Sequence, residues 1–320
     1  MDSMAVQALL FVAGLILIYF GAEGMVKGAA SLARALRIRP LVIGLTVVAF
    51  GTSAPELVVS LLAAAQKSEA LAVGNVIGSN IANIALILGV AAILRPLRVE
   101  RGLVRREIPM MLVASFLFYG LAWSGTISRP FGGILLAGLV VFLLYSVRTA
   151  REQPQGGPAQ AERPDETSLT RRSTLKNGLL CLFGLGGLLV GAKVLVGSGV
   201  FLARAFGVSE GIIGLSLVAG GTSLPELATT VVASIRKEAD LGIGNIIGSN
   251  LFNILAVIGL GSLVRPLPVE HDWLLFQFPV MLFFSLALLP LMLGRVIRRW
   301  EGGLLFAGYC AFLIWLFRIP

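Results

Sequence analysis

The sequence contains few of the residues that form most catalytic and structural metal sites. Its 320 residues include two cysteines and one histidine. Cys181 and Cys310 lie far apart in apolar segments without the short spacing of zinc or redox motifs, so we interpret both as small core residues. A hydrolase needs a nucleophile with a base or a metal site. With His271 as the single histidine and no HExxH motif, the composition argues against an enzyme.

Charged residues are also scarce. They make up 13% of the chain, against about 25% in soluble domains, and 57% of the residues are hydrophobic. A helix needs roughly 20 apolar residues to cross a bilayer. Ten such runs cover residues 5–34, 40–65, 70–94, 107–124, 129–147, 177–204, 210–235, 240–264, 273–294 and 302–318. We therefore expect an all-α membrane protein with ten transmembrane helices, the first too long to be a cleavable signal peptide.

The net charge of +9 is compatible by itself with binding to nucleic acid. The placement of the charges indicates another cause. If the N-terminus lies outside, nineteen Lys and Arg residues fall on the inner side of the membrane and five on the outer side. This bias follows the positive-inside rule and predicts that both termini lie outside. We therefore expect contact with anionic lipid and no nucleic-acid partner.

The two halves of the chain are copies of one another. Without gaps, residues 41–97 match residues 211–267 at 26 of 57 positions, with an offset of 170. Each copy holds five predicted spans, an odd number, so the second copy is inserted in the inverted orientation. The sequence thus divides into a first five-helix repeat (1–147), a flexible cytoplasmic linker (148–176) and a second, inverted repeat (177–320).

Each repeat carries Gly-Thr-Ser-x-Pro-Glu inside an apolar span, at 51–56 and at 221–226. Proline removes a backbone donor and crowds the carbonyl four residues back, so the helix breaks and frees carbonyls that must find partners or line a cavity. A glutamate at membrane depth is costly and marks an ion path. Thr52 and Ser53 lie four and three residues before Glu56, so their oxygens share one helix face. The second copy repeats this spacing with Thr222, Ser223 and Glu226.

A second segment, Gly-Asn-x-x-Gly-Ser-Asn-x-x-Asn, follows at 74–83 and 244–253. Its serine and last asparagine are four residues apart on one face, as Ser79 and Asn83 and as Ser249 and Asn253. The two copies together offer two carboxylates with hydroxyl, amide and carbonyl oxygens, which suit hard cations such as Ca2+. We expect helices 2, 3, 7 and 8 to be broken around this central site.

Two features have competing interpretations. The broken helices can be purely structural, but structure alone would not place a carboxylate twice at equivalent positions within the membrane. Glu23 and Lys27 on the first span can form a helix-local ion pair, or they can take part in gating. Lys193 occupies the position equivalent to Glu23.

The two segments resemble the alpha repeats of the Ca2+/cation antiporter superfamily, and the whole chain is similar to the prokaryotic Na+/Ca2+ exchangers. The resemblance implies a secondary antiporter of the prokaryotic inner membrane that exchanges Ca2+ for Na+ by alternating access, without a cofactor or an obligate protein partner. It implies that Glu56 and Glu226 are the central ligands. The further ligands it implies are oxygens of Thr52, Ser53, Thr222 and Ser223, the carbonyls of Ala49 and Ala219, the hydroxyls of Ser79 and Ser249, and the amides of Asn83 and Asn253.

Asn253 departs from part of this family, because some members carry Asp at that position. One potential carboxylate is therefore absent, and the number of Na+ ions exchanged stays open. A Ca2+/H+ exchanger that uses the same glutamates is the alternative within the class. A passive cation channel is the alternative from a different class, and the duplicated broken helices favour a carrier.

Overall fold

The computed structural model describes residues 3–66, 68–152, 171–207 and 219–316, and this part of the chain is almost entirely helical. The first repeat contains α1 (Met4–Ala35), α2 (Pro40–Ile43), η1 (Gly44–Val48), α3 (Ala49–Thr52), α4 (Ala54–Ala65), α5 (Glu69–Ile81), η2 (Ala82–Leu88), α6 (Gly89–Leu94), α7 (Arg101–Arg105), α8 (Glu107–Ala122) and α9 (Arg129–Glu152). The second contains α10 (Arg171–Ala205), α12 (Ala219–Thr222), α13 (Leu224–Ile235), α14 (Ala239–Phe252), η5 (Asn253–Ile258), α15 (Gly259–Val264), α16 (His271–Leu275), α17 (Gln277–Leu293) and α18 (Arg299–Leu316). The η segments are π-helical turns.

These helices occupy the ten predicted spans. Among the described residues six helices are long and apolar enough to cross a membrane, and the bent pair Pro40–Thr52 and Ala54–Ala65 makes a seventh. The remaining three ranges hold α8, α13 and α18, with residues 208–218 of one range outside the description. The two inverted five-helix repeats are therefore confirmed. Both ends of the predicted 148–176 linker are helical, since α9 runs to Glu152 and α10 begins at Arg171.

Helix interruption takes two forms. In the second span the axis bends by 44° between α3 and α4. The third and eighth spans instead run continuously through Glu69–Leu94 and Ala239–Val264, and each contains a π-helical turn. These turns begin at Ala82 and Asn253, inside the polar segment of each copy. Such turns occur often at functional sites.

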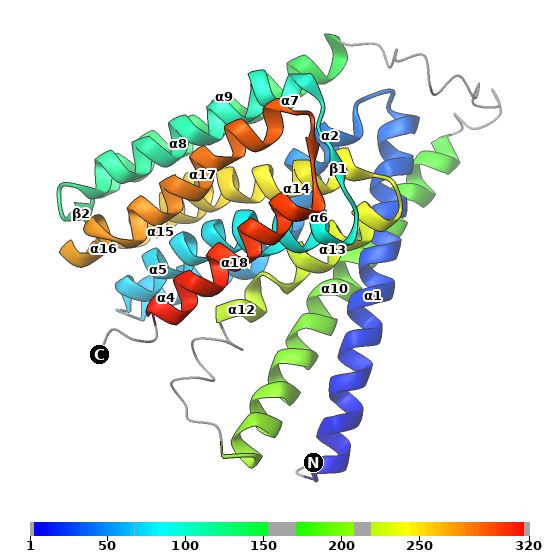
Figure 1. Ribbon diagram of the computed structural model, residues 1–320, viewed down its shortest axis with the longest axis horizontal. Helices are drawn as coiled ribbons and strands as arrows, with labels where there is room; N and C mark the ends of the chain where they lie inside the picture. Colours follow the sequence, from blue (N-terminus) through cyan, green and yellow to red (C-terminus); the bar gives the residue numbers. More distant parts are fainter. Residues whose placement is uncertain (1–2, 67, 153–170, 208–218, 317–320) are drawn as a thin grey trace.

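Four short strands were not predicted, and they join the two repeats. Strand β1 (Leu97–Arg98) pairs antiparallel with β4 (Val296–Ile297), and β2 (Thr126–Ile127) pairs antiparallel with β3 (Leu267–Pro268). The offset of 170 converts the first pair into the second, and the two pairs lie at opposite ends of the helices (Figure 1). Each repeat is therefore hydrogen-bonded to the other at both ends of the core.

The hydrophobic interior has two parts. The larger cluster is formed by side chains of both repeats from α5, α8, α14 and α17, and includes Phe118, Met111, Phe278 and Met281. The smaller cluster joins α1 to α10 through residues such as Met25 and Leu188, and it joins both helices to the core through residues such as Val232 and Leu241. In Figure 1 α1 and α10 lie side by side and cross the other helices steeply. The first span of each repeat thus forms a two-helix unit beside a larger core.

Glycines permit the close approach of α1 and α10. A Cβ added at Gly14, Gly21 or Gly28 would lie 2.5 to 2.8 Å from backbone nitrogens of α10. The three glycines are seven residues apart, and their partners Leu195, Leu188 and Cys181 run in the reverse order. The two helices are therefore antiparallel, with backbone against backbone at every second turn.

Candidate cation site

The two Gly-Thr-Ser-x-Pro-Glu segments form the same local structure. Ser53 has φ −83° and ψ 6°, and Ser223 has φ −87° and ψ 4°, so each serine lies outside helical geometry. A proline in the first turn then starts a new helix, α4 or α13, without needing a backbone donor. Glu56 and Glu226 lie in the first turns of these helices, where the helix dipole favours negative charge.

The two glutamates meet through serines of the opposite repeat. Ser53 Oγ donates to Glu226 Oε1 at 2.9 Å, and Ser223 Oγ donates to Glu56 Oε1 at 3.2 Å. Glu226 Oε1 also lies 3.5 Å from Ser249 Oγ. All of these side chains are buried, and the glutamates are at most 1% exposed. The predicted meeting of the two signature segments is therefore present in the structure.

Asparagines form a second pair of crossed contacts. Asn83 Nδ2 donates to Asn250 Oδ1 at 3.0 Å, and Asn253 Nδ2 donates to Asn80 Oδ1 at 3.2 Å. Asn80 and Asn250 in turn direct their amide nitrogens toward methionine sulfurs of α17 and α8. Because Asn80 and Asn250 accept with their oxygens, they orient the amides of Asn253 and Asn83 so that the Oδ1 atoms point away from these contacts.

These contacts leave four buried oxygens without a hydrogen-bond partner among the described residues. They are Oε2 of Glu56 and Glu226 and Oδ1 of Asn83 and Asn253, two equivalent pairs. Buried acceptors are normally satisfied, because an unpaired buried polar atom costs free energy. Four of them on the signature segments therefore indicate a place for a ligand that accepts oxygen donors, as a hard cation does.

The other predicted residues lie on the same broken and π-helical segments. Thr52 Oγ1 donates to Asn245 Oδ1 at 3.0 Å, and Ser79 Oγ lies 3.4 Å from Ser223 Oγ. The carbonyl of Ala49 already accepts from the N–H of Ser53 at 3.0 Å and lies 3.4 Å from Thr52 Oγ1. Thr222 lies one residue before the break, and Ala219 begins α12, with its side chain outside the description.

Four asparagines that had not been predicted as site residues hold the site together. Asn75 and Asn245 donate to Ser60 Oγ at 3.0 Å and Thr230 Oγ1 at 3.3 Å, which joins the third and eighth spans to α4 and α13. Asn80 and Asn250 orient the amides described above. Their presence at the same positions in both copies was the available signal.

The residue types at the candidate site determine which kind of cation it can bind. In the part of the chain that the structure describes, no group of three or more His, Cys, Asp or Glu residues could hold a metal ion. The candidate site has two carboxylates supplemented by neutral oxygens, enough charge for one divalent cation. Ca2+ takes six to eight oxygen ligands at about 2.3–2.6 Å in flexible geometry. Such a site suits reversible binding of a hard cation.

The crossed serines allow a symmetric test. Ser53→Ala and Ser223→Ala are each expected to weaken Ca2+ binding about tenfold, because each leaves one glutamate without its neutral donor and removes an oxygen. Calcium binding measured by isothermal calorimetry checks this. The matched control is Thr46→Ala, since Thr46 Oγ1 donates within its own helix, to the Val42 carbonyl at 2.6 Å. A tenfold loss for one serine and none for the other would contradict a shared site.

Comparisons with known proteins show which proteins the whole chain is similar to. The family model described as sodium/calcium exchanger protein matches residues 6–148 and 176–318. The chain is 39% identical over 322 residues to the putative antiporter CaxA of Alkalimonas amylolytica, covering 98% of this chain and 99% of that one. It is 35% identical over 349 residues to the sodium/calcium exchanger MaX1 of Methanosarcina acetivorans, covering 99% and 100%. A solved structure of the sodium-calcium exchanger NCX_Mj, soaked with 10 mM Na+ and zero Ca2+, superposes with a TM-score of 0.85 at 33% identity and covers 99% of this chain and 100% of the other.

Proposed function

Because this chain belongs to the sodium/calcium exchanger protein family, we propose that it exchanges Ca2+ for Na+ across the membrane, with Glu56 and Glu226 as the central ion ligands. The observation that supports this most is the crossed set of serine and glutamate contacts, which leaves one oxygen of each carboxylate buried and unpartnered among the described residues. The membrane is the prokaryotic inner membrane, with both termini outside, and the substrates are Ca2+ and Na+.

Charge explains why ions must be exchanged. Two bare carboxylates would place two uncompensated charges against apolar surface, so an empty core would resist switching between faces. One Ca2+, or two or more Na+, neutralises them. A Ca2+-loaded core and a Na+-loaded core can therefore both switch, and net transport requires that one replaces the other.

The arrangement of α1 and α10 favours one direction of access. α1 packs along α13, and the charged residues at this contact belong to the predicted cytoplasmic side. The pair equivalent to α1 and α13, which is α10 and α4, has no comparable packing among the described residues. We infer that the path to the site is closed on the cytoplasmic side and more open on the outer side. The switch would bring α10 against α4 and separate α1 from α13.

Reconstitution separates Na+ from H+ as the counter-ion. Sealed liposomes loaded with Na+ and diluted into Na+-free medium with radioactive Ca2+ are expected to accumulate Ca2+, because exit of Na+ drives entry of Ca2+. Liposomes with a pH gradient and no Na+ are the parallel arm and are expected to accumulate little. Ca2+ uptake driven by the pH gradient alone would show that the counter-ion is H+ and not Na+. Flux that needs neither gradient nor counter-ion would indicate a passive channel and would contradict exchange.

A further inference from the structure

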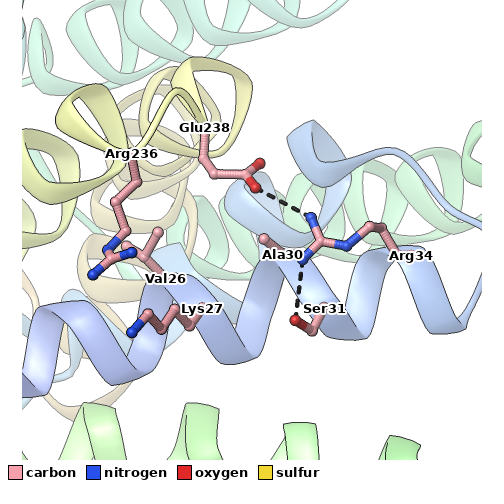
Figure 2. A pocket seen from close by; sticks show the side chains of 7 residues that line it. All are labelled: Val26, Lys27, Ala30, Ser31, Arg34, Arg236 and Glu238. Atoms are coloured by element: carbon pink, nitrogen blue, oxygen red, sulfur yellow. Dashed lines mark hydrogen bonds and ion pairs between the residues drawn. The ribbon is translucent and has the colours of Figure 1, made fainter. Parts of the chain in front are cut away.

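A polar pocket lies where α1 meets the turn between α13 and α14. It has a volume of about 190 Å³ and is lined by Val26, Lys27, Ala30, Ser31, Arg34, Arg236 and Glu238. Figure 2 shows Lys27 lying along α1 and the Arg34 guanidinium extending toward Glu238, while Arg236 reaches from the core toward α1. The side chains of Lys27, Arg34 and Arg236 are 51%, 58% and 36% exposed, so the pocket is open to solvent or to lipid headgroups.

Positive charge exceeds negative charge in this pocket. Arg34 pairs with Glu238 at 3.2 Å and also donates to Ser31 Oγ at 3.1 Å. Glu23 lies just outside the lining, and the same carboxylate oxygen, Oε1, pairs with both Lys27, at 2.8 Å, and Arg236. Three cations therefore face two carboxylates. Lys27 has three donors and each arginine has five, so more N–H groups are present than these carboxylates and Ser31 accept.

The fold does not require these charges. At the positions offset by 170, Lys27 corresponds to Gly197, Ser31 to Phe201, Arg236 to Gln66 and Glu238 to Ser68. The second repeat therefore builds the same helices without this set. Helix-local pairing, predicted for Glu23 and Lys27, is confirmed, but it accounts for neither Arg236 nor the excess cation.

We propose that this pocket binds a phosphate-type anion, held by Lys27, Arg34 and Arg236 with the Ser31 hydroxyl. Phosphate oxygens accept several charge-assisted hydrogen bonds at once, which matches the unused N–H groups of two guanidiniums and one ammonium. A volume of about 190 Å³ is several times that of a water molecule, roughly 30 Å³ in the liquid. The anion is either the headgroup phosphate of an acidic phospholipid or a free phosphate.

A bound anion would add a link between two parts of the molecule that already meet through apolar packing and ion pairs. Lys27 and Arg34 belong to α1, and Arg236 belongs to the core. The pocket exists only while α1 packs on α13, so the anion stabilises this arrangement of α1 over any arrangement in which the helices separate. The binding itself needs no ion exchange, so it is measured on the purified full chain without transport.

Two arms identify the source of the phosphate. In the first, native mass spectrometry counts phosphatidylglycerol and phosphatidylcholine adducts on the same sample. In the second, the thermal midpoint is measured with inorganic phosphate against sodium chloride of equal ionic strength, because exposed charges are screened by salt. Selective phosphatidylglycerol adducts assign the site to lipid. A midpoint raised by phosphate, without lipid selectivity, assigns it to the free anion.

Variants link either result to the pocket. Lys27→Gln leaves Glu23 paired with Arg236 and is expected to lower anion binding about five- to tenfold. Ser31→Asp places a carboxylate beside Arg34 and is expected to abolish anion binding while the unliganded midpoint stays equal or rises. Lys193→Gln removes one exposed charge from α10 and should change nothing. Absence of anion binding in both arms, or binding that persists in Ser31→Asp, would overturn the proposal.

Discussion

Glu226→Gln is expected to abolish Na+-driven Ca2+ uptake, and Glu56→Gln is expected to do the same. Glutamine keeps the volume of the side chain and can still accept from Ser53 or Ser223, so the contacts across the repeats survive. It removes one of the two charges that a buried divalent cation requires. Loss of one partner from a buried charge pair costs about 3–5 kcal/mol, which corresponds to a hundredfold or greater loss of affinity. Initial rates of radioactive Ca2+ uptake into liposomes measure the effect.

Glu107 supplies a matched control for this result. It is a buried glutamate with an unpartnered Oε2 among the described residues, yet it begins α8, outside the signature segments. Its equivalent in the second repeat is Gln277, which shows that glutamine fits the same place in the fold. Glu107→Gln is expected to retain at least half of the uptake. Equal loss in Glu107→Gln and Glu226→Gln would mean that any buried carboxylate matters and would remove the special role of the central pair.

Gly21→Ala is expected to reduce transport at least tenfold without weakening Ca2+ binding. The added methyl group would lie 2.5 Å from the backbone nitrogen of Leu188 and 2.9 Å from the carbonyl oxygen of Gly184. Both are backbone atoms, so the helices must move apart, and such overpacking costs about 1–3 kcal/mol. The proposed ion ligands lie on the core and not on α1. Calorimetry of Ca2+ binding and uptake into liposomes, measured on the same preparation, separate the two effects.

Gly24→Ala is the control on the same helix. Its methyl group would lie 3.5 Å from the nearest atom, an ordinary contact. Alanine also favours the helix by roughly 0.5–1 kcal/mol relative to glycine. We expect normal transport and unchanged or slightly raised stability. If Gly21→Ala also transports normally, the close approach of α1 and α10 does not limit the switch.

The repeat made the centre of the molecule predictable. The proline four residues after Gly51 or Gly221 predicts where each span breaks. The offset of 170 implies that the second copy has the same break in the opposite orientation in the membrane. These two facts predict that the two segments meet, but the pairing of Ser53 with Glu226 and of Ser223 with Glu56 was not predicted, because the spacing indicated only that the serine and glutamate of one copy share a helix face. The buried asparagine contacts are only partly predictable from the motif. The motif shows that Asn80 has an equivalent in the second copy, but not that its side-chain oxygen accepts from Asn253.

Contacts between segments far apart in the sequence could not be predicted, because they depend on how the helices and loops are placed in space. The strands at Leu97 and Ile297 are two residues long and carry no alternating pattern, so only the approach of the two loops creates them. The pairing of Arg236 with Glu23 depends on where α1 lies against the core, which periodicity does not specify. Some equivalent positions differ between the repeats, such as Gln66 in the first and Arg236 in the second. The sequence shows this difference, but only the position of α1 shows that Arg236 takes part in a pocket.

The strand pairs bear on how the halves of the molecule can move. At one end β1 holds β4, and Val99 N donates to Arg295 O at 2.9 Å. At the other end β2 holds β3, and Val269 N donates to Gly125 O at 2.9 Å. Because these strand pairs link the two repeats at both ends of the core, we expect them to restrict any movement of one repeat against the other. α1 and α10 carry none of the four strands, so the proposed switch would move these two helices against a core whose repeats stay joined.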